Sequence, residues 1–220
     1  MRALILEHVS CLSKPYLILN TYVCSFTNLS ISMRKLLVIL LFFGSTLISL
    51  AQSPTPSEIF WENLKKHCGK SYAGSLPEGV THKDFSGKKL VMHVRACENN
   101  RIRIPFFVDN DRSRTWVFTL ENGVIKLKHD HRHEDGSEDK ITQYGGVASN
   151  TGMAEMQMFP ADQETANLIG YAANNVWWVT LNQEIFSYNL RRTGAPSAFS
   201  VLFDLSKPIQ APEAPWGWVD

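Results

Sequence analysis

Residues 101–133 read RIRIPFFVDNDRSRTWVFTLENGVIKLKHDHRH, and this stretch decides the fold class. Apolar and polar side chains alternate along it, so that Ile102, Ile104 and Phe106 share one face. Such alternation is typical of half-buried antiparallel strands. The Asn-Gly pair at 122–123 separates two of the alternating segments and favours a hairpin turn, because both residues tolerate positive φ. The stretch therefore predicts consecutive β-hairpins.

The same pattern extends on both sides of this stretch. We expect strands at Ser71–Gly74, Lys88–Glu98, Arg101–Asp109, Arg114–Glu121, Val124–His133, Lys140–Gly145, Ala154–Phe159, Thr165–Ile169, Asn175–Leu181, Glu184–Arg192 and Ala198–Leu205. Thr55-Pro56-Ser57-Glu58 is a capping box and predicts one short helix over 56–68. We therefore expect a mainly β protein, an antiparallel up-and-down β-barrel, because closure removes free strand edges. A β-sandwich is the alternative.

The chain of 220 residues also carries a targeting pattern. Met33-Arg34-Lys35 precede an apolar run that ends in small residues at Ser49 and Ala51, as in a secretory signal peptide. A transmembrane anchor is the alternative. The predicted organisation is a non-native upstream extension at 1–32, a signal peptide at 33–51, and one barrel domain at 52–220 with a Pro/Trp-rich tail at 206–220. The mature protein should be periplasmic or extracellular, with no stable membrane span.

The net charge limits the classes of binding partner, and the cysteine content bears on disulfide formation. The full chain has 22 Lys and Arg against 21 Asp and Glu, and residues 1–51 hold four of the basic residues and one of the acids. The mature part is therefore close to neutral, which gives no electrostatic reason to bind nucleic acid. Cys68 and Cys97 remain in the mature part, and we expect them to form a disulfide, since exported proteins retain such bonds. Two buried thiols are the alternative.

Two sequence resemblances bear on the fold. The helix leading into Gly69–Gly74, with Tyr72 as the aromatic residue of the first strand, resembles the calycin superfamily of lipocalin-like barrels. That resemblance implies an up-and-down barrel. A second resemblance, to a family of uncharacterised secreted bacterial proteins, implies export and no particular activity. It is carried by HDHRHEDGS at 129–137, Tyr144-Gly145-Gly146, Phe159–Asp162 and Ala214–Trp218.

A row of histidines is the unusual feature of the chain. On a strand His129, His131 and His133 would share one face, and that face continues Ile125 and Leu127 on the apolar side. The row should therefore point into the barrel, near one end. The predicted ligand-binding residues are His129, His131, His133, Tyr144, Trp178 and Tyr188.

The same row is a candidate metal site for zinc or another transition metal. Histidines two apart on a strand can converge on one ion, whereas those four apart, about 13 Å, hardly can. The predicted metal ligands are His129, His131, His133 and His93. The alternative is an inward polar cluster that is hydrogen-bonded to tyrosine, asparagine or carboxylate partners.

Three functions remain open at this point. The first is an exported barrel that binds a small, partly apolar molecule in its lumen through a His-lined mouth. The second is a metal- or His-dependent enzyme at the barrel mouth, with haem bound by one histidine as a variant. The third is a structural or interaction protein of the cell envelope. A lumen with room for a ligand favours the first, and a lumen filled by side chains excludes it.

Overall fold

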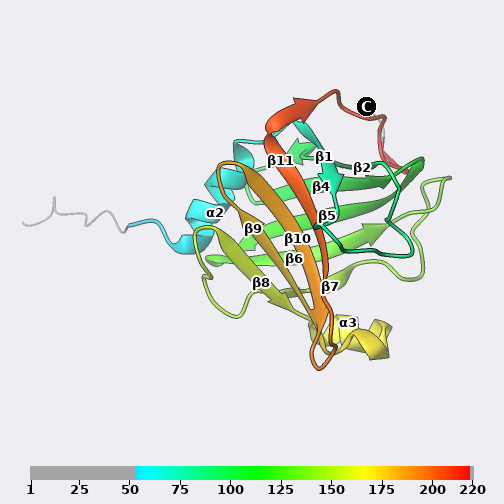
Figure 1. Ribbon diagram of the computed structural model, residues 1–220. Helices are drawn as coiled ribbons and strands as arrows, with labels where there is room; N and C mark the ends of the chain where they lie inside the picture. Colours follow the sequence, from blue (N-terminus) through cyan, green and yellow to red (C-terminus); the bar gives the residue numbers. More distant parts are fainter. Residues whose placement is uncertain (1–52, 219–220) are drawn as a thin grey trace, which may run out of the picture. The chain divides into compact units, whose positions relative to one another are not determined.

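The computed structural model describes residues 53–218 (Figure 1). The predicted upstream extension and signal peptide lie outside the described residues. The described part is mainly β, with one antiparallel sheet of eleven strands. The strands are β1 (Ser71–Ser75), β2 (Leu90–His93), β3 (Ala96–Cys97), β4 (Arg101–Val108), β5 (Asp111–Glu121), β6 (Val124–His131), β7 (Tyr144–Val147), β8 (Met156–Pro160), β9 (Asn175–Leu181), β10 (Ile185–Arg192) and β11 (Phe199–Ile209).

The strands follow one another around the sheet in chain order. Its path is β7-β6-β5-β4-β2-β1-β11-β10-β9-β8, and β3 pairs with β4 beside β2. The last strand returns to pair with the first, and Gly146 of β7 forms a single bridge with Ala161, the residue after β8. The sheet thereby curls into an almost closed barrel. The up-and-down barrel expected from the sequence is confirmed, and the sandwich alternative is wrong.

Two glycines of β7 allow close backbone approach on both sides of that strand, Gly146 at the seam with β8 and Gly145 against β6. A Cβ added to Gly146 would lie 1.8 Å from the carbonyl oxygen of Pro160, and one on Gly145 would lie 1.9 Å from that of Leu127. Gly145 also has a φ of +156°. Because glycine has no Cβ, the neighbouring backbones can approach this closely. The Asp162 amide then donates to the Gly145 carbonyl oxygen across the seam.

Helix α2 (Pro56–Lys65) fills one end of the barrel (Figure 1). Its capping box is formed as expected, with Thr55 and Glu58 bonded to each other's backbone amides. The helix buries Phe60, Trp61 and Leu64 in the core shared with the strands. Aromatic and aliphatic side chains of the strands belong to the same core. At this end the barrel interior is thus a packed core.

Segment 163–172 differs from the prediction. Thr165–Ile169, expected as a strand, forms the last four residues of helix α3 (Gln163–Leu168) and its C-cap, and the chain then enters a short 3₁₀ turn, η1 (Gly170–Ala172). Asp162 caps α3 by accepting from the Thr165 amide. The Thr165 hydroxyl donates to the Gly145 carbonyl and accepts from the Gly145 amide, which ties α3 to β7.

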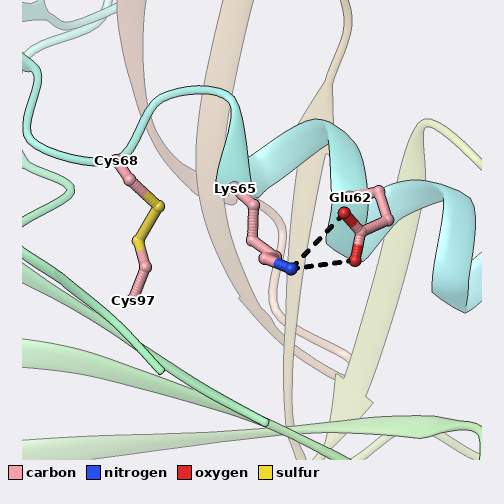
Figure 2. Close-up of a disulfide and its surroundings, with 4 residues drawn as sticks. All are labelled: Glu62, Lys65, Cys68 and Cys97. Carbon is pink, nitrogen blue, oxygen red and sulfur yellow. Dashed lines mark hydrogen bonds and ion pairs between the residues drawn. A yellow bond between two sulfur atoms is a disulfide. The ribbon is translucent and has the colours of Figure 1, made fainter. Parts of the chain in front are cut away.

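The cysteines expected to pair do so. Cys68 and Cys97 form a disulfide with Cα atoms 6.1 Å apart (Figure 2). The bond joins the segment after α2 to β3, beside the Glu62–Lys65 ion pair on the helix surface. It therefore holds the helix that fills this end against the barrel wall.

The C-terminal tail packs back on the barrel. The Trp216 amide donates to the Arg112 carbonyl, and Arg103 lies 4.3 Å from the ring centre of Trp218. The tail starts later than predicted, because β11 continues to Ile209. Among residues 53–218 the helices are too short to span a bilayer.

Candidate functional site

The end of the barrel away from α2 encloses a cavity of about 310 Å³. Its walls come from the inward faces of β4, β5, β6, β7, β9, β10 and β11, and from three connecting segments. His82 and Phe85 come from the β1–β2 connection, Ile141 from the β6–β7 connection, and Tyr171 from η1. The lumen is therefore packed at one end and hollow at the other.

Stacked rings form the floor of this cavity. Trp116 of β5 lies between Phe106 and Tyr188, with ring centres 4.9 Å and 4.3 Å away and planes within 13° of parallel. Trp177 of β9 lies beside them, almost fully buried. All three stacked residues also belong to the hydrophobic core, so the floor of the cavity is continuous with the packed interior.

His129 sits at the same level and makes two hydrogen bonds. Its Nδ1 lies 3.0 Å from the Tyr144 carbonyl oxygen, and its Nε2 lies 2.6 Å from the Tyr188 hydroxyl. A carbonyl oxygen only accepts, so Nδ1 carries the proton, and Tyr188 donates to Nε2. Burial lowers the pKa of His129 from 6.5 to about 3, despite the favourable backbone contact. The ring is therefore neutral and its orientation is fixed.

The tyrosines beside it are neutral for the same reason. Burial raises the pKa of Tyr144 to about 12 and raises that of Tyr188 well above its ordinary value. The Tyr144 hydroxyl lies 3.0 Å from Nε2 of His131, and its ring stacks on His129 at 4.6 Å. Burial, helped by the charge of Arg114, lowers the pKa of His131 as well. The cavity wall thus carries polar but uncharged groups among apolar rings.

The charged groups of the cavity lie at its mouth. Strand alternation places Arg114 on the same face as Trp116, and Arg192 on the same face as Tyr188, in each case nearer the end of the barrel. Arg114 pairs with Asp111 of its own strand. Arg192 donates from Nε to the Asn175 side chain at 3.4 Å and lies over the ring of Tyr171.

The structure brings together four of the six predicted ligand-binding residues. His129, His131, Tyr144 and Tyr188 all line the cavity. The placement of Trp178 is wrong, because Trp177 faces inward and the next residue of a strand faces outward. The placement of His133 is also wrong. Strand β6 ends at His131, and His133 is exposed in the turn that follows.

The four predicted metal ligands do not gather around one point. His93 is on β2 next to the inward-facing Met92, so it points away from the lumen, and it does not line the cavity. Both ring nitrogens of His129 already have partners, and Nε2 of His131 has Tyr144. Within residues 53–218 no three His, Cys, Asp or Glu side chains are arranged to hold a metal ion. The arrangement observed is the alternative stated above, an inward polar cluster with tyrosine partners.

Sequence reasoning missed most of the cavity wall, including two of its tryptophans, Trp116 and Trp177, and both of its arginines, Arg114 and Arg192. Arg114 and Trp116 lie on the same face of β5, and they pair with His131 and His129 of the neighbouring strand β6. The alternation of β5 therefore carried a usable signal. The sequence alone does not give the pairing register between β5 and β6, and that register is needed to place these side chains beside the histidines.

No protein-family model, curated protein or solved structure matches this chain. The candidate site therefore rests on its own geometry.

Proposed function

We propose that this protein is an exported binding protein that holds one small, partly apolar molecule at the open end of its barrel. The observation that carries the proposal is the division of the lumen. Side chains fill the end that α2 closes, whereas a cavity of about 310 Å³ lies above the aromatic stack at the other end. Ligand pockets typically span about 300–1,000 Å³, so the occupant would be small.

The polar groups of the cavity suit such a molecule. Ligand sites are mostly apolar and carry a few polar groups that fix the orientation of the ligand. Here Tyr144 and His131 offer a hydroxyl and a ring nitrogen in the wall, while His129 and Tyr188 hold each other below. Since these groups are neutral, an apolar molecule can lie against them without meeting a buried charge.

Two features support export. Residues 33–51 have the order of a secretory signal peptide, with a basic start, an apolar run and small residues at the end. The Cys68–Cys97 disulfide fits an oxidising compartment, because thiols inside most cells are kept reduced. Both point to a protein that works outside the cytosol.

A fluorescent probe tests the proposed binding. 1-Aminoanthracene is a small neutral aromatic molecule whose emission increases on leaving water. We expect saturable binding of one probe per protein. Leu190 lines the cavity on β10, so Leu190→Trp should fill part of the space and weaken binding at least tenfold.

The matched control is Ile185→Trp, the same substitution on the same strand. Ile185 is 41% exposed and lies outside this cavity, so its variant should bind the probe like the natural protein. Thermal unfolding verifies that both variants fold. Absence of saturable binding, or equal affinity in the Leu190→Trp variant, would overturn the proposal.

A further inference from the structure

Rings make up most of the cavity wall. Phe106, Trp116, Trp177, Tyr188 and Phe199 present aromatic faces or edges to the space, from five different strands. The stacked members already lie within 13° of parallel. Aromatic rings prefer offset stacking or edge-to-face contact with other rings, so a flat, rigid ligand gains more from these walls than a flexible chain.

The charge of the cavity has one sign. Of Lys, Arg, Asp and Glu in the described residues, the cavity is lined by Arg114 and Arg192, and by no carboxylate. Asp111 balances Arg114 through their ion pair. For Arg192, by contrast, no carboxylate of residues 53–218 lies within ion-pair distance, and Asn175 bonds only to its Nε. The two terminal nitrogens of Arg192 therefore remain available as donors.

The position of Arg192 fits an acid group at the mouth. Alternation along β10 puts Tyr188, Leu190 and Arg192 on one face, with Tyr188 in the floor and Arg192 at the end of the strand. Four residues of a strand span about 13 Å. That distance accommodates a molecule of one or two fused rings with an acid group at one end. A guanidinium binds a carboxylate through two parallel hydrogen bonds, which a neutral amide cannot reproduce.

We propose that the ligand is a small planar aromatic anion, with its ring on the Trp116–Tyr188 floor and its acid group on Arg192. This inference rests on the proposed binding function and specifies the class of ligand. Arg114 adds positive charge at the same mouth, reduced by Asp111. Tyr171 stabilises the Arg192 side chain through a cation–π contact, with its ring centre 5.2 Å from the guanidinium carbon.

Three probes of similar size test the class of ligand by isothermal titration calorimetry of the purified protein. Naphthalene-2-carboxylate is the planar aromatic anion, naphthalene-2-carboxamide is its neutral counterpart, and decanoate is an anion without a ring. We expect the carboxylate to bind about tenfold more tightly than either of the other two. Arg192→Gln should weaken binding of the carboxylate at least fivefold and leave the affinity for the carboxamide unchanged.

Arg191→Gln is the matched control. Arg191 is the neighbouring residue on the opposite face of β10, exposed, and does not line the cavity. The Arg191→Gln substitution removes the same net charge and should leave the affinities for the carboxylate and the carboxamide unchanged. Equal binding of carboxylate and carboxamide, or an Arg191→Gln effect as large as that of Arg192→Gln, would overturn the inference while leaving the binding function intact. Tighter binding of decanoate would assign the site to aliphatic acids instead. Failure of all three probes overturns the inference too, and a simultaneous failure of 1-aminoanthracene overturns the binding function with it.

Discussion

At the scale of single residues, the His129–Tyr188 pair shows how the barrel holds polar groups in its interior. The Tyr188 hydroxyl donates to Nε2 of His129 at 2.6 Å, and the Tyr144 carbonyl oxygen accepts a hydrogen bond from the Nδ1–H of the same imidazole. A buried polar group without a partner costs a few kcal/mol, so this pairing is what allows a histidine at the level of the aromatic floor. The pair adds polarity to the site without adding charge.

The low pKa of His129 predicts a pH-dependent stability. The unfolded chain takes up a proton near pH 6.5, whereas the folded protein does so only near pH 3. The contribution is therefore fully present above pH 6.5 and is lost as the pH falls from 6.5 towards 3. At pH 5 the loss should be about 2 kcal/mol relative to pH 7.5. Urea unfolding at the two pH values measures it, and His129→Gln should reduce the difference by that amount.

Tyr188→Phe provides the control for this experiment. It removes the hydroxyl but keeps the imidazole of His129 buried, so most of the pH dependence should persist. A His129→Gln protein with the same pH dependence as the natural one would show that the loss comes from other groups, such as His67 and His131, whose pKa values burial also lowers.

Some predicted residues of the site were placed correctly from the sequence and others were not, for identifiable reasons. His129 and His131 follow from the alternation that they share with Leu127. Trp177 and Trp178 do not, because apolar residues flank both and alternation cannot tell which one faces inward. His133 was misplaced because the turn begins early: its amide donates to the Ser137 carbonyl and its carbonyl accepts from the Gly136 amide.

At the scale of elements, α3 is where the prediction of secondary structure failed. Thr165–Ile169 alternates weakly and contains β-branched residues, which favoured a strand. The decisive residue lies upstream, since Asp162 caps the helix and also pairs with Lys128 of β6. A cap outweighs weak alternation in so short a segment. The hairpins of β4, β5 and β6, by contrast, were predictable because strong alternation and turn residues agree.

The close approach of the two backbones at the seam between β7 and β8 predicts that adding one methyl group at Gly146 lowers the stability of the protein. Gly146→Ala would place its Cβ 1.8 Å from the Pro160 carbonyl oxygen, so the two strands must move apart. We expect a loss of about 2–3 kcal/mol in unfolding free energy, as for other overpacked sites. Urea denaturation measures this loss.

Gly170→Ala is the control variant for Gly146→Ala. Nothing lies within 4 Å of a Cβ built on Gly170, and its φ is not in the left-handed region. Its stability should stay within about 0.5 kcal/mol of the natural protein. If the two variants unfolded alike, close approach at the seam would not be the cause.

At the scale of the whole molecule, the two ends of the barrel have different structural supports. One end is closed by α2, whose apolar face joins the core and whose following segment is covalently tied to β3. The other end is bounded by connecting segments and holds the cavity. The sequence predicted the barrel and the helix, but not which end would be hollow, because that depends on how side chains from distant strands meet across the lumen.

Because the disulfide and the cavity lie at opposite ends of the barrel, we expect that loss of the disulfide lowers stability without changing ligand affinity. Replacing both Cys68 and Cys97 by Ala opens a loop with a sequence separation of 29 residues, which should cost about 3–4 kcal/mol in the chain-entropy model. Chemical denaturation measures the loss. The folded variant should still bind 1-aminoanthracene with natural affinity, because the cavity lies at the other end. A parallel loss of probe affinity under folding conditions would show that the two ends are coupled.

The stack of Phe106, Trp116 and Tyr188 has an optical consequence. Nearly parallel rings with centres 4.3 and 4.9 Å apart couple their electronic transitions in a fixed chiral arrangement. The near-ultraviolet circular dichroism of the folded protein should therefore contain a strong contribution from this one place. Two of the six tryptophans, Trp116 and Trp177, line the cavity. Whatever occupies it would perturb those bands, so the barrel carries a built-in spectroscopic reporter of its own occupancy.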